Sequence, residues 1–380
     1  MVINYKRLND NTIEDAYKIP GKDSLINRIQ NSTYFSKLDL KSGFWQIKMH
    51  PDSVKYTAFT IPNGGHYEWL VMPFGLKNAP AEFQKMMDKI FGKYYKFVAV
   101  YIDDILVFSK NKREHINHLQ IVFSEIERHG LIISKKKMEL FKYNIKFLGS
   151  EIGKGTIKLQ AHISQKILDM PDKLEDLKLL QTFLGLVNYA RPFIKNLSKY
   201  TGPLYSKTSI KGQRYFNTSD IKLVQEIKAL VKTLPELKLP LDTDYLIIEV
   251  DGCEKGWGAV LLRKPEKFSP KDLEEVCRYS SGKYTVKTTS SLDYEILAVI
   301  NALQSFHLYL LNKQEIVTRT DCEAIVKYFK TEKENNKRVM SRWIDFKNEI
   351  INTGIKVIFE HIAGKKNQFA DFLSRISTYM

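Results

Sequence analysis

The chain has 380 residues, too many for one ordinary hydrophobic core, so we expect two or three domains. Its formal net charge of +16, of which residues 1–200 carry +11, favours a surface that follows phosphates, although charge alone does not separate nucleic acid from acidic lipid. The three cysteines are too far apart for a zinc knuckle, and their odd number indicates a reducing compartment. No long apolar run or signal peptide is visible, so we expect a soluble intracellular protein without a membrane partner.

The first predicted strand, Tyr34–Leu40, carries one acid, Asp39, close to its end. Its side chains alternate weakly between polar and apolar, as strand residues do. A turn at Ser42-Gly43 then leads into a short amphipathic run over residues 44–47. We therefore expect the Asp39 carboxylate to lie at the end of the strand, next to this turn.

The next predicted element is a β-hairpin over residues 97–108, with Asp103 and Asp104 at its tight turn. Adjacent carboxylates repel each other and lose solvation energy unless a cation neutralises them, and Mg²⁺ prefers carboxylate oxygens. A solvated Asp-Asp turn is the alternative for this pair alone. Asp39 supplies a third acid, and three carboxylates on neighbouring strands suit two-metal phosphoryl transfer.

Four successive motifs within residues 37–104 resemble those of reverse transcriptases of the Ty3/gypsy and Caulimoviridae type. They are Lys37-Leu38-Asp39-Leu40-Lys41-Ser42-Gly43-Phe44, Met72-Pro73-Phe74-Gly75-Leu76-Lys77-Asn78-Ala79-Pro80, Phe83-Gln84 and Tyr101-Ile102-Asp103-Asp104. The resemblance implies that Asp39, Asp103 and Asp104 bind two Mg²⁺ ions, with Mn²⁺ as an acceptable substitute. The implied substrates are deoxynucleoside triphosphates and an RNA or DNA template-primer.

The same resemblance implies roles for further residues. Phe44 matches an aromatic gate that clashes with a 2′-hydroxyl and so selects deoxynucleotides, although an ordinary core Phe is the alternative. Lys137 is a candidate general acid for the leaving pyrophosphate, with a solvated basic turn nearly as well supported. The residues expected to line the nucleotide and template pocket or to form the hairpin that grips the primer are Phe74, Gly75, Gln84, Leu148 and Gly149.

Two histidines on the next predicted helix, His115 and His118, have a spacing that could bind a metal. Because no Cys or Asp partner lies nearby, we predict a pair on the helix surface instead. From residue 151 to 240 the apolar pattern becomes helical and resembles the thumb of the same elements. No catalytic motif falls within this segment, and it leaves no room for a connection domain.

A second set of acids begins at Asp251, which ends a buried strand over residues 246–252. Glu295 adjoins the apolar face of a helix that Ser290-Ser291 could cap, and Asp321 ends another strand, over residues 315–320. Taken singly, each is an ordinary acid. With Asp371 in a predicted C-terminal helix they resemble the four-carboxylate, two-Mg²⁺ site of ribonuclease H, with His361 ten residues before the last acid. Release of product or metal is one role for His361, and a buried structural histidine is the alternative.

The whole chain thus resembles a reverse transcriptase joined to ribonuclease H. Residues 278–284 and 319–322 resemble segments of the Caulimoviridae, those of the badnavirus and tungrovirus branch in particular. The expected fold is an α+β fingers and palm over residues 1–150, with a helical thumb and linker over 151–240. An α/β ribonuclease H domain with a mixed five-stranded sheet is expected over 241–380.

The resemblance also implies a biological setting. We expect a piece excised from a viral polyprotein, present in the host cytoplasm and virus particle, that acts on RNA–DNA hybrids and starts from a tRNA primer. The segment over residues 2–9 resembles a strand that follows a basic triphosphate loop, so we expect incomplete fingers. A Ty3/gypsy retrotransposon enzyme and a non-catalytic subunit of a larger complex are the alternatives, and the oligomeric state stays open.

Overall fold

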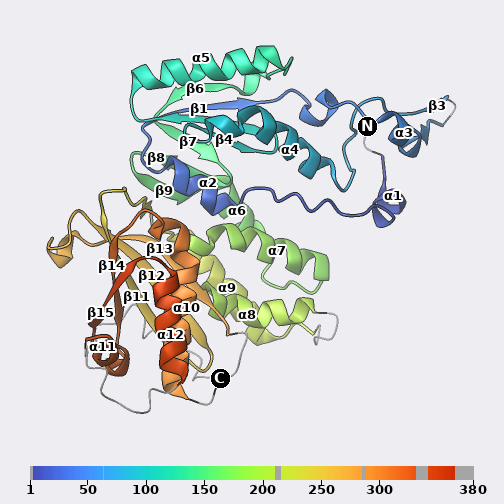
Figure 1. Ribbon diagram of the computed structural model, residues 1–380. Coiled ribbons are helices and arrows are strands. Elements are labelled where there is room, and N and C mark those ends of the chain that lie inside the picture. The colour runs from blue at the N-terminus through green and yellow to red at the C-terminus, as the bar shows by residue number, and fades with distance from the viewer. Residues whose placement is uncertain are drawn as a thin grey trace. The chain divides into compact units, whose positions relative to one another are not determined.

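The computed structural model describes residues 3–62, 64–209, 215–284, 288, 290–330 and 341–363 (Figure 1). The chain divides into two compact units, Met1–Ile145 and Lys146–Met380, and each is described by itself. Within the described residues, no helix combines the length and apolar character that crossing a bilayer requires.

The first unit is built on an antiparallel sheet with the strand order β4-β5-β1-β6. Apolar side chains of its strands, such as Leu38, Ile105 and Val107, are fully buried in one cluster with residues of α4 and α5. The bounds of these elements are β1 Tyr34–Asp39, β4 Val98–Tyr101, β5 Asp104–Ser109, β6 Glu139–Lys142, α4 Ala79–Phe91 and α5 Lys112–Arg128. The predicted hairpin with its acids at the turn is confirmed.

Short elements complete this unit, most of them before α4. A small hairpin pairs β2 with β3. The bounds are α1 Lys6–Asp10, α2 Lys22–Ile29, η1 Gly43–Gln46, α3 Pro51–Val54, η2 Lys55–Thr57, β2 Phe59–Thr60, β3 His66–Tyr67, η3 Gly92–Tyr94 and η4 Lys135–Lys137.

The prediction of a histidine pair on the helix surface is wrong for His115. Its side chain is fully buried, because this face of α5 turns toward the sheet. The two ring nitrogens of His115 lie 2.7 Å from Ser36 Oγ and 2.8 Å from Ser109 Oγ. His118 Nδ1 lies 2.8 Å from the same Ser109 hydroxyl. Hydroxyl partners on both nitrogens suit a neutral imidazole, which needs one donor and one acceptor.

A small sheet with the order β10-β9-β8-β7 precedes and flanks a group of helices in the second unit. The bounds are β7 Asn144–Phe147, β8 Ser150–Gly153, β9 Thr156–Leu159, β10 Leu237–Lys238, α6 Ala161–Asp169, α7 Leu177–Ala190, η5 Arg191–Phe193, α8 Leu197–Thr208 and α9 Thr218–Lys232. The expectation that the helical pattern begins near residue 151 is therefore wrong for its first residues. Lys154 and Gly155, both at positive φ, form the turn that joins β8 to β9.

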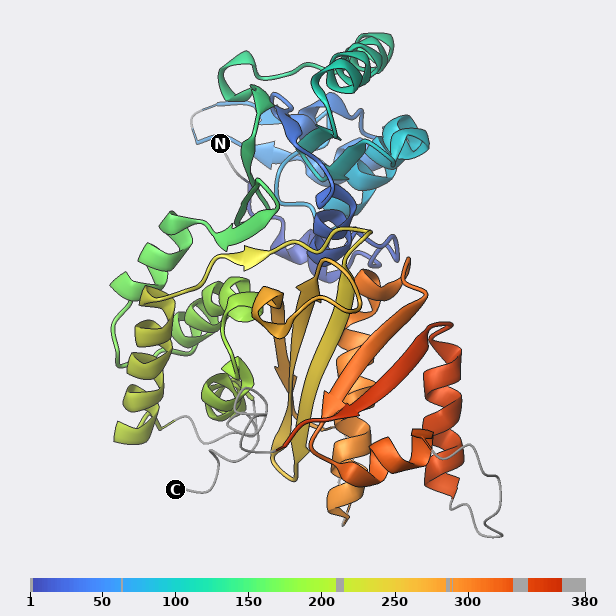
Figure 2. The ribbon, with the colours of Figure 1, turned by 90° about the vertical axis from the view of Figure 1, so that its left-hand side faces the viewer.

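The rest of this unit is a five-stranded sheet with the order β13-β12-β11-β14-β15, which confirms the predicted mixed sheet (Figure 2). The pairs β11·β14 and β14·β15 are parallel and the other pairs antiparallel. One core cluster joins this sheet to α10, α11 and α12. The bounds are β11 Tyr245–Cys253, β12 Gly256–Lys264, η6 Lys271–Leu273, β13 Glu275–Gly282, α10 Ser291–Leu310, β14 Glu315–Thr320, α11 Glu323–Lys330, α12 Ser341–Asn352 and β15 Lys356–His361.

Two details of this sheet and its helices differ from the sequence-based expectations. The edge strand β13 contains Arg278–Gly282, which we used only as a mark of family and not as a strand. Ser290 occupies the N-cap position of α10, yet its side chain makes no capping hydrogen bond. The predicted C-terminal helix with Asp371 lies outside the described residues.

Candidate active sites

The turn between β4 and β5 consists of Ile102 and Asp103, since Tyr101 pairs directly with Asp104. Ile102 has φ +51, a left-handed conformation that is strained for a β-branched residue. The side chain of Gln84 forms hydrogen bonds with the backbone of this turn and of the strand before it. Its Oε1 accepts a hydrogen bond of 2.7 Å from the Ile102 N–H, and its Nε2 donates to the Val100 carbonyl at 3.3 Å. Because Gln84 is fully buried, it supports the acidic turn and offers no surface to a substrate.

The three predicted acids of the first unit come from the end of β1, which carries Asp39, and from the β4–β5 hairpin, which carries Asp103 in its turn and Asp104 at the start of β5. In the β1–β5 ladder, Asp39 stands directly opposite Asp104. Asp103 Oδ1 is buried and has no hydrogen-bond partner among the described residues. Burial raises the pKa of Asp103, and the nearby charges of Asp39 and Asp104 raise it further. A Cβ on Gly43 would lie 2.3 Å from Asp103 Oδ1 and 2.9 Å from the Phe83 ring, so any larger residue there would displace one of these side chains.

Two lysines form ion pairs with the acids of this group, one with Asp39 and the other with Asp104. Lys137 Nζ lies 3.2 Å from Asp39 Oδ1, so the structure brings this predicted residue to the acids. Lys37 Nζ lies 2.9 Å from Asp104 Oδ1, a contact that was not predicted from the sequence. The available signal was its position two residues before Asp39, which puts both side chains on one face of β1.

This first group of acids fits a divalent cation. A buried carboxylate oxygen without a partner, next to two more carboxylates, is costly unless a positive charge balances it. Hard cations take oxygen ligands of this kind. In the present geometry the lysine ammonium groups supply part of that positive charge.

Three aromatic rings pack together next to Gly43, the glycine that faces Asp103. Phe44 lies in η1, and its ring centroid is 5.3 Å from that of Phe74 and 5.4 Å from that of Phe83. Both Phe44 and Phe74 remain partly exposed, which is compatible with a gate as well as with core packing. Gly75 follows at φ +97, a conformation that side chains disfavour.

The residues expected to grip a primer lie at the turn from β7 to β8. Leu148 and Gly149 have φ values of +47 and +79, as a two-residue hairpin turn requires. A Cβ on Gly149 would come within 2.6 Å of the Tyr189 ring, so the ring of α7 can approach only because glycine is there.

A second acidic group lies in the five-stranded domain. Asp251 on β11, Glu295 on α10 and Asp321 after β14 each offer an oxygen within 4.8 Å of the others. These three acids could hold a divalent metal ion. Gly252, next to Asp251, allows these acids to come together. A Cβ on Gly252 would come within 2.5 Å of the Tyr294 carbonyl oxygen. Glycine thus lets the first turn of α10 approach the strand and bring Glu295 to Asp251.

His361 ends β15, the strand beside β14. It pairs with Thr320, immediately before Asp321, and its side chain is exposed. An exposed position contradicts the alternative of a buried structural histidine. Asp371, the fourth acid of the expected set, lies outside the described residues, so its distance from His361 is undefined.

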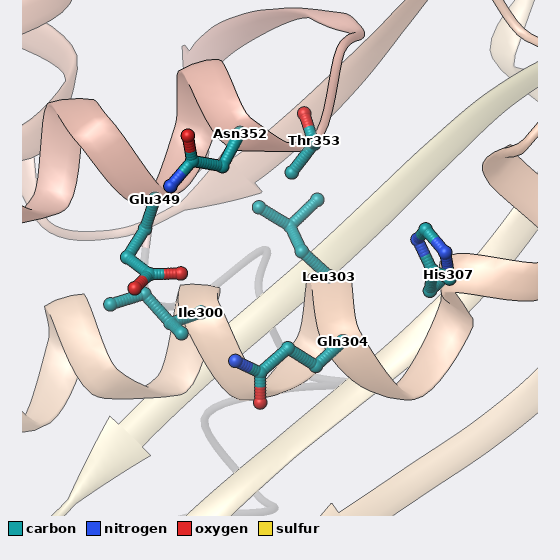
Figure 3. A pocket seen from close by; sticks show the side chains of 7 residues that line it. All are labelled: Ile300, Leu303, Gln304, His307, Glu349, Asn352 and Thr353. Atoms are coloured by element: carbon teal, nitrogen blue, oxygen red, sulfur yellow. The ribbon is translucent and has the colours of Figure 1, made fainter.

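A separate shallow groove of about 290 Å³ runs between α10 and α12 (Figure 3). None of the predicted site residues line it. Its walls are Ile300, Leu303, Gln304, His307, Glu349, Asn352 and Thr353.

Residues 1–152 match the family described as reverse transcriptase (RNA-dependent DNA polymerase). Residues 242–349 match the RNase H-like domain found in reverse transcriptase. Over 381 aligned residues the chain is 45% identical to Polyprotein P3 of Commelina yellow mottle virus, covering 100% of the chain and 20% of the polyprotein. It is also 41% identical to the enzymatic polyprotein of cauliflower mosaic virus, strain Strasbourg, covering 99% of the chain and 55% of that protein.

The chain thus carries a reverse transcriptase domain and an RNase H-like domain, and its relatives at 39–45% identity include polyproteins of Commelina yellow mottle virus, cauliflower mosaic virus and figwort mosaic virus. It spans about half the length of the cauliflower mosaic virus protein and a fifth of Polyprotein P3. Among solved structures, it resembles a foamy viral protease–reverse transcriptase in complex with dsDNA, with a TM-score of 0.72 and 25% identity, over 95% of this chain and 74% of that one. A second structure of a foamy viral protease–reverse transcriptase in complex with dsDNA gives a TM-score of 0.74 at 25% identity, over 95% of this chain and 62% of that one.

Proposed function

We propose that this chain is an RNA- and DNA-templated DNA polymerase that also degrades RNA in RNA–DNA hybrids. The observation that carries the proposal is the presence of two separate acidic groups, one on each matched domain. Each group has carboxylates from elements far apart in sequence, which a scaffold has no need to bring together. The activity serves replication of a pararetroviral genome through an RNA intermediate.

At the polymerase site, Asp39, Asp103 and Asp104 would hold two Mg²⁺ ions. Magnesium, when bound, supplies Lewis-acid activation of the primer 3′-hydroxyl and neutralises charge on the triphosphate. The ammonium group of Lys137, beside Asp39, donates a proton to the leaving pyrophosphate. Phe44 closes the sugar pocket and excludes a 2′-hydroxyl, with Phe74 and Gly75 lining the nucleotide side.

At the nuclease site, Asp251, Glu295 and Asp321 would hold Mg²⁺ beside the scissile RNA phosphate, with Asp371 as a fourth ligand. Their clustered charge explains why a cation is needed there, since oxygens within 4.8 Å of one another repel strongly when ionised. Exposed His361, on the neighbouring strand, assists release of product.

The substrates we propose are deoxynucleoside triphosphates, an RNA or DNA template-primer started from a tRNA, and RNA–DNA hybrids. The net charge of +16 supports a polyanionic partner, and the foamy viral enzyme of similar fold is described in complex with dsDNA. We place the enzyme in the host cytoplasm and virus particle, because its relatives are viral polyproteins.

The test is one reaction that follows both activities. A DNA primer carrying one dye is annealed to an RNA template carrying another, and Mg²⁺ and deoxynucleotides are added. The proposal predicts a lengthening primer and a shortening RNA. Primer extension without RNA cleavage would contradict the nuclease part of the proposal. If neither activity is seen with Mg²⁺ or Mn²⁺, the chain would instead be a non-catalytic scaffold.

A further inference from the structure

We infer that Gln46 is a positioning residue that holds Lys137 at the polymerase site. Its side-chain amide bonds to both backbone groups of Ile132, which lies 86 positions away. Gln46 Oε1 accepts from the Ile132 N–H at 2.9 Å, and Gln46 Nε2 donates to the Ile132 carbonyl at 3.0 Å. The same Nε2 donates to the Lys41 carbonyl at 2.8 Å. One side chain thus imitates the paired backbone of a strand and ties two segments together.

The tied segment runs beside the strand end that carries Asp39. Lys41 N–H donates to the Ile132 carbonyl at 2.9 Å, and Ser134 N–H donates to the Asp39 carbonyl at 2.8 Å. Leu40 and Ile133 form an isolated antiparallel bridge between these bonds. The segment then enters η4, where Lys137 N–H donates to the Ser134 carbonyl at 3.1 Å.

From η4 the Lys137 ammonium reaches Asp39 at 3.2 Å, although its side chain is 68% exposed. Little packing therefore fixes this side chain, and its position depends on the backbone that carries it. The backbone of this segment is held by the short ladder of hydrogen bonds between residues 132–134 and 39–41. The Gln46 side chain adds two further hydrogen bonds to this ladder, both at Ile132. Proton transfer requires the donor within hydrogen-bond reach of the leaving oxygen, so a shift of about 1 Å suffices to slow it.

The inference rests on the proposed polymerase function with Lys137 as the general acid. The test variant is Gln46→Met, which keeps the length of the side chain and removes its donor and acceptor. Gln120→Met is the matched control, because Gln120 is exposed on α5. Thermal melting of each variant shows whether the full chain remains folded. Gln46→Glu, which keeps an acceptor for the Ile132 N–H, carries the test if the Met variant does not fold.

Single-turnover extension is measured with β,γ-methylene and β,γ-difluoromethylene deoxynucleotides. These differ in leaving-group basicity, so loss of a general acid raises the ratio of the difluoromethylene rate to the methylene rate. We expect Gln46→Met to lower kcat about tenfold, to leave KM within about twofold and to raise this ratio. In a Lys137→Met background, Gln46→Met should add no further loss.

A lower kcat with an unchanged ratio, or losses that multiply in the double variant, would overturn the inference and leave Gln46 a structural residue. If Lys137→Met neither slows extension nor changes the ratio, the acid role of Lys137 fails and the inference fails with it. If the unchanged protein does not extend primers, the proposed polymerase function fails first. The three failures are thus distinguishable.

Discussion

The amide oxygen of Gln84 accepts a 2.7 Å hydrogen bond from the backbone N–H of Ile102, the residue before the first acid of the turn. Ile102 is left-handed, a conformation that costs about 1–3 kcal/mol for a residue of this type. Gln84 is in turn bonded to Asp88 at 2.9 Å, and Asp88 accepts from the Tyr17 hydroxyl at 2.7 Å. The acidic turn is therefore fixed by a chain of hydrogen bonds that runs from buried Gln84 to the partly buried Asp88 and Tyr17.

Gln84→Met should leave the Ile102 N–H without its partner and loosen the turn. Because a buried group without a hydrogen bond costs about 1–3 kcal/mol, we expect a lower melting temperature and primer extension reduced about tenfold. Melting curves and extension kinetics measure the two effects, with Gln120→Met as control. Extension and melting equal to those of the unchanged protein would contradict the supporting role.

Asp103→Asn should abolish primer extension while sparing cleavage of RNA in a preformed hybrid. The substitution keeps the shape of the side chain but removes the charge of the buried oxygen, so the site loses a metal ligand. The control is Asp52→Asn, since Asp52 is exposed on α3 of the same unit. Extension at the unchanged rate would show that the acidic turn is a solvated one.

Phe44→Ala should admit ribonucleotides about tenfold better, and deoxynucleotide use should fall because sugar packing is lost. The measurement is the ratio of kcat/KM for the two nucleotides on one template. Phe59→Ala serves as the aromatic control, since its ring packs against Tyr67 and Trp69 in the small hairpin. If the ratio does not move in Phe44→Ala, this residue belongs to the core alone.

Glu295→Gln should reduce cleavage of RNA in an RNA–DNA hybrid by about 100-fold or more. It removes one charge from the group formed with Asp251 and Asp321, whereas DNA synthesis uses acids of the other unit. Binding should persist, because phosphate contacts from Lys and Arg dominate affinity. Glu349→Gln is the matched control, because Glu349 is exposed on α12. Full cleavage by Glu295→Gln would remove the case for this nuclease site.

The buried His115 should make stability depend on pH. Burial first, and then the nearby His118, lower its pKa from 6.5 to about 4. In the folded protein the imidazole thus stays neutral where the unfolded chain already binds a proton. The contribution of neutral, buried His115 to the free energy of unfolding is complete above pH 6.5 and is lost as the pH falls toward about 4.

Urea unfolding at about pH 7.5 and pH 5 measures this loss, which we expect to be about 2 kcal/mol at most. His115→Gln should lower stability at the higher pH and remove most of the difference between the two conditions. His162→Gln, exposed at the start of α6, is the control. An equal pH dependence in His115→Gln would show that other groups cause it.

Most of the acids singled out from the sequence lie at a turn or at the end of a segment that reads as a strand. Alternation identified the β4–β5 hairpin, and apolar runs identified strands β11 and β14, whereas the close approaches at Gly43 and Gly252 emerged only from the structure. The family resemblance then assigned their chemistry. These signals all lie within a few residues of the acids themselves.

The supporting residues could not be predicted in this way. Gln46 and Gln84 bond to backbone groups 86 and 18 positions away, and neither bond leaves a local pattern. The burial of His115 depends on which face of α5 meets the sheet, and its neighbouring residues are polar enough to suit either orientation. Residues 156–159 were assigned to a helical region, although Gly155 before them permits the turn of a hairpin.

The order of the strands along the chain has a consequence for synthesis on the ribosome. All four strands of the β4-β5-β1-β6 sheet, and therefore Asp39, Asp103 and Asp104, have been made once residue 142 has been added. The parallel pairing of β11 with β14 must wait for about 70 further residues after β11 begins, and a parallel pair with so long a connection forms slowly. Nascent chains halted after the first unit should therefore already protect their palm amides from hydrogen exchange, while the nuclease strands acquire protection only late in translation.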